Sequence, residues 1–137
     1  MNIREITISD YEKLIPFWKA NYFVNEMDSK DRFKLFLENN PSLSVLAEDG
    51  GIIVGTALGS FDGRRGYLQK VVVDRSQRKK GIGQQLVKKI IKKLQLLRAT
   101  YIPISVEEEN TRFYENCGFK KTTQVPMNIE IPVPSIS

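Results

Sequence analysis

One segment of the chain constrains its fold more than any other: residues 71–84, which read VVVDRSQRKKGIGQ. The three consecutive β-branched valines predict a buried strand that is covered on both faces. From Gly83 onward, apolar residues recur at the three- and four-residue spacing of one helical face. The lysines of this stretch occupy the opposite face: Lys88, Lys89, Lys92 and Lys93. The segment therefore predicts a strand, a basic turn with two glycines and a long amphipathic helix, in that order.

This turn combines three features of an anion-binding site. The first N–H groups of a helix have no partner within the helix, and the helix dipole places positive charge at the same end. Gly81 and Gly83 lack a β-carbon, so a phosphate can approach the main chain closely. Arg78, Lys79 and Lys80 add cationic side chains. A pyrophosphate is the expected ligand, although an ordinary basic strand-to-helix turn would show the same pattern.

Two common phosphate-binding motifs do not match this turn. A dinucleotide fingerprint needs a third glycine where Leu86 stands, and an acidic residue near Pro103, where none is found. A P-loop needs Lys followed by Ser or Thr after its last glycine, whereas Gln84 and Gln85 follow here. Both readings fail.

A second motif lies downstream, over residues 110–119, which read NTRFYENCGF. It predicts a short helix that is closed by Gly118 and followed by a strand. Together, the two segments resemble the Gcn5-related N-acetyltransferase (GNAT) superfamily, which carries Arg/Gln-x-x-Gly-x-Gly/Ala and later Asn-x-x-(Phe/Leu)-Tyr-x-x-x-Gly-Phe. The resemblance implies an α+β fold in a single domain over residues 1–137, with a mixed, mostly antiparallel sheet of six to seven strands and about four helices.

Periodicity and turn signals predict the individual elements. Strands are expected over residues 2–8, 43–48, 52–61, 100–106, 119–125 and 127–133, with a further strand that contains residues 71–73. Helices are expected from Ser9 or Asp10 to about Ala20, from Asp28 or Ser29 to about Glu38, from Gly83 onward and over residues 109–117. The Asp49-Gly50-Gly51 turn predicts a hairpin, and Pro126, Pro132 and Pro134 suit an edge strand.

Composition limits the chemistry and the location. A chain of 137 residues fits one domain, and the single cysteine excludes an internal disulfide. The sequence contains no histidine, so Ser-His and Cys-His schemes are excluded and no metal site is expected. Its start lacks the apolar run of a signal peptide, and no stretch is apolar enough to span a bilayer. We therefore expect a cytoplasmic protein without a membrane partner.

The resemblance implies a site for acetyl-CoA and assigns roles to particular residues. The cofactor-binding residues would be Val71, Val72, Val73, Arg78, Lys79, Lys80, Gly81, Ile82, Gly83, Gln84, Asn110, Phe113 and Tyr114. Main-chain groups of Val71 and Val73 would pair with the pantetheine arm, which would lie between residues 71–73 and residues 104–106. Tyr114 would be the catalytic residue, with its hydroxyl directed at the sulfur, unless it is a core aromatic.

Several alternatives about the mechanism remain open at this point. The acidic residue that many GNAT members carry before the glycine turn is missing, because Gln69 and Lys70 stand there. Glu107, Glu108 and Glu109 could relay a proton through water, or could merely cap and solvate a helix start. Cys117 lies near Tyr114 on one helical face and could carry an acetyl group, although a buried structural cysteine is the more ordinary interpretation.

Function and partners follow from the resemblance. It implies direct transfer of acetyl to a primary amine of a small molecule or peptide. The alternative functions are a non-catalytic acyl-CoA sensor and, given the net charge of +5, a nucleic-acid-binding protein. No stacking platform for nucleic acid is visible, so no such partner is expected. The first two helices should border the acceptor pocket with Phe17, Trp18, Tyr22, Phe23 and Glu26, and Glu26 or Asp28 could select a cationic amine. Family members often pair through sheet edges or the C-terminal strand, which suggests a homodimer.

Overall fold

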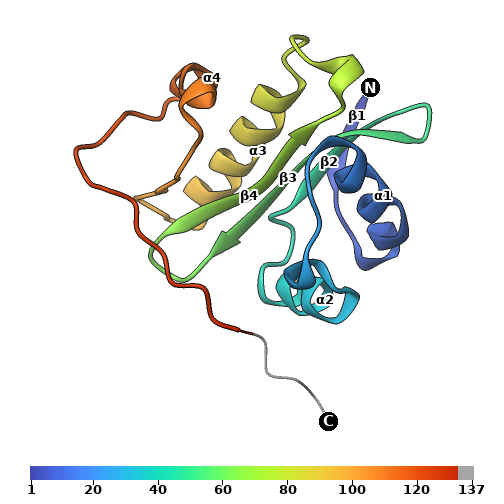
Figure 1. Cartoon of the computed structure of the whole chain (residues 1–137), viewed down its shortest axis with the longest axis horizontal. Coiled ribbons are helices and arrows are strands. Elements are labelled where there is room, and N and C mark those ends of the chain that lie inside the picture. The colour runs from blue at the N-terminus through green and yellow to red at the C-terminus, as the bar shows by residue number, and fades with distance from the viewer. Residues whose placement is uncertain (133–137) are drawn as a thin grey trace. The chain divides into compact units, whose positions relative to one another are not determined.

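The computed structural model describes residues 1–132 and divides the chain into two compact units, Met1–Ile104 and the residues from Ser105 on (Figure 1). The elements of the first unit are β1 (Asn2–Glu5), α1 (Tyr11–Asn21), α2 (Lys30–Asn39), β2 (Val45–Asp49), β3 (Ile52–Phe61), β4 (Gly66–Val73) and α3 (Ile82–Leu96). The second unit contains α4 (Thr111–Asn116). Within residues 1–132, no helix is both long enough and apolar enough to cross a membrane.

The sheet of the first unit is antiparallel throughout, and its strands follow the order β1-β2-β3-β4. The predicted α+β class and the four helices are confirmed, whereas the mixed sheet of six to seven strands is wrong for the described residues, which form four strands. Residues 100–106 and 119–132 form no strand, apart from an isolated parallel bridge between Arg65 and Tyr101. Val133 and Pro134, which belonged to the last predicted strand and its edge, lie outside the described residues.

The missing strands have a physical explanation. Alternating apolar residues give a segment the pattern of a strand, but a strand is stable only when a neighbouring strand accepts its hydrogen bonds. Residues 125–131 keep that pattern without burial. The apolar side chains Val125, Met127, Ile129 and Ile131 are 79–91% exposed.

Local signals placed the helices correctly. Ser29 precedes α2 as predicted, and its hydroxyl accepts a hydrogen bond from the N–H of Arg32 at 3.4 Å. The Asp49-Gly50-Gly51 turn joins β2 to β3, and both glycines have positive φ. The residues within each cap or turn were therefore sufficient to predict these boundaries.

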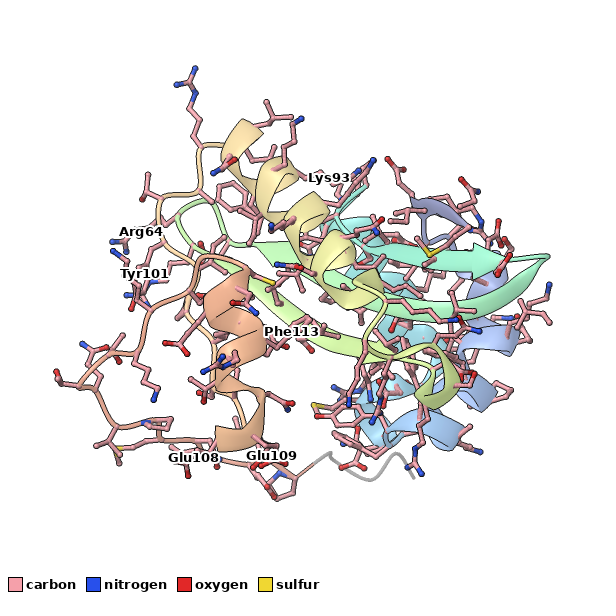
Figure 2. The ribbon with its side chains drawn as sticks, turned by 90° about the horizontal axis from the view of Figure 1, so that it is seen from above. Arg64, Lys93, Tyr101, Glu108, Glu109 and Phe113 are labelled. Atoms are coloured by element: carbon pink, nitrogen blue, oxygen red, sulfur yellow. The ribbon has the colours of Figure 1, made fainter. Side chains whose placement is uncertain are left out.

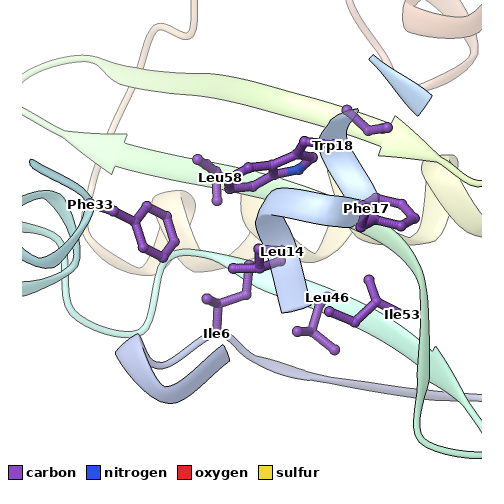
Figure 3. Packing of buried hydrophobic residues seen from close by; sticks show 9 residues of the cluster. Ile6, Leu14, Phe17, Trp18, Phe33, Leu46, Ile53 and Leu58 are labelled. Carbon is purple, nitrogen blue, oxygen red and sulfur yellow. The ribbon is translucent and has the colours of Figure 1, made fainter. Parts of the chain in front are cut away.

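Helices cover both faces of the four-stranded sheet. On one face α1 and α2 enclose a cluster that includes Leu14, Trp18 and Phe33 (Figures 1 and 3). On the other face α3 packs through Leu86, Ile90 and Leu94. Gly59 of β3 permits this approach, because a Cβ there would lie 2.6 Å from Leu43 O and 2.8 Å from Ile90 Cγ2. The sheet is thus the middle layer of the first unit.

The valine run of β4 is less buried than its sequence suggests. Val72 is buried on the α1 side, whereas Val71 and Val73 are half-buried against the α3 cluster. The prediction of full cover on both faces is therefore wrong for Val71 and Val73. The physical reason is that β4 is an edge strand within the described sheet, so one of its sides has no neighbouring strand along most of its length.

An ion pair fastens β1 to the turn before α1. Arg4 Nη2 lies 2.8 Å from Asp10 Oδ1, and the N–H of Thr7 donates to Asp10 Oδ2 at 2.8 Å. Burial by itself would raise the pKa of Asp10, but the hydrogen bonds from Arg4 and Thr7 outweigh it and hold this pKa below its usual value. Asp10 therefore contributes to stability through its charged form.

Candidate active site

A β-bulge interrupts β4 just before the valines. Thr56 pairs with Val72 and Leu58 pairs with Gln69, so Lys70 and Val71 together face the single residue between Thr56 and Leu58. Lys70 adopts a positive φ of 49°, a left-handed conformation that is unusual for a residue with a side chain. The bulge therefore changes the direction of β4 at the point where the predicted cofactor-binding residues begin.

A buried hydrogen-bond chain holds the bulge. The indole Nε1 of Trp18 donates to Thr56 Oγ1 at 3.0 Å, and the Thr56 hydroxyl donates to the carbonyl oxygen of Lys70 at 2.8 Å. Trp18 and Thr56 are both fully buried. The strained residue is thus fixed by α1 and β3, and Trp18 serves the core and not the acceptor pocket.

Beyond the bulge, the main-chain groups of Val73 point toward the side of β4 that is not paired with β3. The N–H of Asp74 donates to Val54 O at 2.9 Å, which makes Asp74 and Val54 a hydrogen-bonded pair. Since such pairs alternate along an antiparallel ladder, the main-chain groups of Val73 point away from β3. Arg78 Nε reaches back to Val73 O at 3.4 Å. The N–H of Val73 is thereby directed at the side of β4 where the resemblance places pantetheine.

The glycine turn presents open donors at the start of α3. In the described chain, residues 1–132, the main-chain N–H groups of residues 80–83 find no hydrogen-bond acceptor, and the first helical bond runs from Gln85 N to Gly81 O at 3.0 Å. Gly81 is the N-cap with φ of 81°, and it has no side chain that could occupy these donors. A Cβ on Gly81 would meet nothing within 4 Å. The N–H groups are therefore accessible to an anion.

Cationic side chains surround this turn. Lys80 Nζ lies 3.0 Å from Gln77 Oε1, and Lys79 adopts a positive φ of 66°. Asp74 is the acidic residue of the turn, and hydrogen bonds from the hydroxyl and the N–H of Ser76 lower its pKa. Its carboxylate is therefore directed back into its own turn. The charge left over at residues 78–80 is positive, as a polyphosphate site requires.

The second unit carries the remaining predicted residues. Asn110 is the N-cap of α4, and Phe113 and Tyr114 make an edge-to-face ring contact, with centroids 4.9 Å apart. Tyr114 also packs against Phe119 at 5.7 Å. The roles of Asn110, Phe113 and Tyr114 at the cofactor stay predictions from the resemblance.

The three glutamates form the start of the second unit's helical segment. Glu107 is the N-cap of a 3-10 turn, Glu108–Asn110, that leads into α4, and all three glutamate side chains are exposed. Figure 2 shows Glu108 and Glu109 at the start of this segment, before helix α4, which carries Phe113. Thr111 Oγ1 donates to Glu108 O at 2.7 Å, which stabilises the turn. Glu107 makes no side-chain cap hydrogen bond, so the exposure of the three glutamates fits solvation of the helix start, and a proton relay through them stays a prediction.

Lys70 lies in the stretch where the resemblance leads us to expect an acidic residue, and the fold brings a carboxylate to it. Lys70 Nζ lies 3.0 Å from Asp28 Oδ2 and donates to Phe23 O at 2.7 Å. It also lies 4.3 Å from the centroid of the Phe23 ring. The side chains of Lys70 and Asp28 are only 9% and 10% exposed. This ion pair argues against the expectation that Asp28 selects a cationic amine, because its carboxylate already has a cationic partner.

A cavity of about 420 Å³ opens beside this ion pair. Its lining includes Asp28 and Lys70, together with Tyr22 and Phe23, which were expected at the acceptor pocket. Phe17 and Glu26, also expected there, do not line it. Phe17 is a core residue instead, because it is buried in the α1 cluster.

Comparisons with known proteins agree with this geometry. Residues 4–119 match the model of the acetyltransferase (GNAT) family. The chain is 32% identical over 111 residues to an acetyltransferase of Photorhabdus laumondii, and the match covers 80% of this chain and 78% of that protein. It is 31% identical over 115 residues to an acetyltransferase of Yersinia enterocolitica, with 80% and 79% covered.

Solved structures share the fold. Glucosamine-6-phosphate N-acetyltransferase from Arabidopsis thaliana superposes with a TM-score of 0.76 at 23% identity, over 96% of this chain and 98% of that chain. The aminoglycoside N-acetyltransferase AAC(6')-Iy in complex with CoA gives a TM-score of 0.71 at 19% identity, over 94% and 93%. The chain belongs to the GNAT acetyltransferase family. It is an enzyme of the acetyltransferase class, and members of this family use acetyl-CoA and act on amine acceptors.

Sequence reasoning missed two parts of this site. Thr56 gave no signal, because a single threonine inside an apolar strand is unremarkable. The Lys70–Asp28 pair joins residues 42 positions apart, and no local pattern links them. Only the absence of an acidic residue near Gln69 pointed to this position.

Proposed function

We propose that this chain transfers the acetyl group of acetyl-CoA directly to a primary amine of a small molecule or peptide. The observation that carries the proposal is the row of unengaged main-chain N–H groups at residues 80–83, placed at the start of α3 and beside cationic side chains. These donors suit a pyrophosphate, because a helix N-terminus stabilises negative charge.

The chain's residues divide the binding of the cofactor among them. In this proposal, the N–H groups of residues 78–84 hold the pyrophosphate, and the main chain of Val71 and Val73 pairs with the amides of the pantetheine arm. The outward direction of Val73 supports this pairing. Val72 lies between these two residues in β4, and contacts of Asn110 and Phe113 with the arm are what the resemblance implies. When bound, acetyl-CoA supplies a thioester whose carbonyl is open to attack by an amine.

Proton transfer sets the energetic demand of the reaction. A lysine-like amine has a pKa near 10.4, so its neutral form costs about 4–5 kcal/mol to reach at pH 7. An N–H group near Val72 or Val73 would stabilise the oxyanion that develops on attack. The carboxylate of Asp28, which the fold brings beside Lys70, is held by that lysine. Deprotonation by water is therefore the route that this arrangement favours.

Tyr114 would assist departure of the thiolate. A tyrosine (pKa about 10) is a weaker acid than a thiol (about 8.5), so complete proton transfer is uphill by roughly 2 kcal/mol. A hydrogen bond from the Tyr114 hydroxyl to the sulfur is enough to lower the barrier without that transfer.

A second candidate function is an acyl-CoA sensor that binds the cofactor without turnover. The observation that favours it is Lys70, which lies in the stretch where the usual acidic residue is missing and which forms an ion pair with Asp28. The cofactor site is the same in both proposals, so binding alone does not distinguish them.

The deciding experiment measures acetyl-CoA binding by calorimetry and free thiol release with a panel of amines. We expect Tyr114→Phe to lower kcat by about 10- to 100-fold with little change in the Kd of acetyl-CoA. Tyr101→Phe is the matched control, since Tyr101 is 46% exposed and lies outside the proposed machinery. Binding without thiol release above hydrolysis for any amine would support the sensor. Absence of binding at millimolar concentration would refute both proposals.

A further inference from the structure

We propose that the amine acceptor carries an apolar, preferably aromatic body and an anionic group such as a carboxylate, and that Arg32 recognises this group. The inference rests on the proposed acetyl transfer and names the chemical class of its acceptor. An amino acid with a large apolar side chain is the simplest molecule of this class.

The walls of the cavity beside the Lys70–Asp28 pair are mostly apolar. The apolar side chains that line it are Tyr22, Phe23, Met27, Phe33, Phe36 and Leu58. Three of them are unusually exposed for their type: Tyr22 at 56%, Phe23 at 47% and Met27 at 64%. Large apolar side chains that gather at one hollow and remain in water indicate a binding surface. The volume of about 420 Å³ lies within the range of small-molecule sites.

Within residues 1–132, the charges of the cavity leave Arg32 as a cation without an ion-pair partner. Asp28, Arg32 and Lys70 are the charged residues of its described lining, and the Lys70–Asp28 pair at 3.0 Å cancels two of these three charges. Arg32 is exposed on α2, and no carboxylate among residues 1–132 forms an ion pair with it. A guanidinium matches a carboxylate or phosphate through two parallel hydrogen bonds. The net positive charge of the lining also disfavours polycationic amines.

Two polar residues of the lining lie on the strand that leads into the proposed thioester site. Gln69 and Lys70 line it from β4, and Val71 follows them directly. Arg32 lies on α2, a different wall. An acceptor that places its anionic group at Arg32 and its body on the aromatic side chains would therefore direct its amine toward β4.

Recognition is tested separately from turnover by measuring how tightly the enzyme binds an acetylated product. The probes are N-acetylphenylalanine and its carboxamide, which differ in the carboxylate and have no ionisable amine. We expect the acid to bind wild type about 5-fold or more tightly than the amide, and Arg32→Gln to reduce that ratio to about 1. Lys34→Gln is the matched control, because it removes the same charge from an exposed position of α2 that does not line the cavity, and it should keep the ratio. Met27→Gln should weaken the acid and the amide equally, because Met27 contacts only the body.

Thiol release completes the test with phenylalanine, phenethylamine and a polycationic aminoglycoside as acceptors. Preference for phenylalanine that depends on Arg32 supports the inference. Equal use of phenethylamine, use of the aminoglycoside, or an unchanged ratio in Arg32→Gln would overturn the inference while acetyl transfer stands. Acid-selective, Arg32-dependent binding without thiol release from any acceptor would support the assignment of the cavity and refute acetyl transfer instead.

Discussion

Removal of the Thr56 hydroxyl tests how the fold holds the bulge of β4. Thr56→Val keeps the shape of the side chain but deletes both hydrogen bonds, the one from Trp18 Nε1 at 3.0 Å and the one to Lys70 O at 2.8 Å. Because Trp18 and Thr56 are fully buried, no water replaces the lost partners. Each buried group without a partner costs about 1–3 kcal/mol, so the loss of both partners should lower the free energy of unfolding by about 2–6 kcal/mol.

Urea denaturation measures this loss conveniently. Trp18 is the only tryptophan of the chain, so its fluorescence reports unfolding of the core around the bulge. Thr56→Ser is the matched control, since it keeps the hydroxyl and removes one methyl group, at a cost of about 1 kcal/mol. The midpoint should shift clearly further for Thr56→Val, with an unchanged m-value. Equal shifts for the two variants would refute the reasoning that the hydroxyl is what holds Lys70 in its left-handed conformation.

Three further predictions concern charge and exposure. The pKa of Asp10 is lowered in the folded state, so its charge contributes fully to stability above the unfolded pKa of about 3.9, and this contribution disappears as the pH falls below that value. The difference in free energy of unfolding between wild type and Asp10→Asn, measured by urea titration from pH 7 to pH 2, should therefore shrink below about pH 4. A constant difference would contradict this assignment. Lys70→Met should lower the free energy of unfolding by about 3 kcal/mol, because it leaves Asp28 buried without a counter-ion. The double variant Lys70→Met with Asp28→Asn should recover much of that loss. An equally unstable double variant would mean that packing, not charge, matters at this site. The exposed apolar side chains of residues 125–131 should make the chain self-associate through this segment. Sedimentation should detect a dimer for wild type and a monomer for the variant in which Ile129 and Ile131 are both changed to Lys. A wild-type monomer at high concentration would rule this out.

Much of the fold was accessible from the sequence because its signals are local. The lysine face of α3, the cap at Ser29 and the Asp49-Gly50-Gly51 turn depend on neighbours within a few residues, and all three elements formed where they were expected. The two family motifs likewise identified a GNAT acetyltransferase, because the glycine turn and the Asn110–Phe119 segment are short and contiguous.

Tertiary structure alone decided the features that depend on distant partners. The bulge at Lys70 requires a hydroxyl from β3 and an indole from α1, and the ion pair with Asp28 closes a loop of more than forty residues. The expected strands after α3 failed for the same reason, since alternation along a chain does not specify which strand accepts its hydrogen bonds. The cationic cavity at Arg32 follows from that arrangement too, because only folding shows that Lys70 cancels the charge of Asp28 and leaves Arg32 without a counter-ion in the described chain.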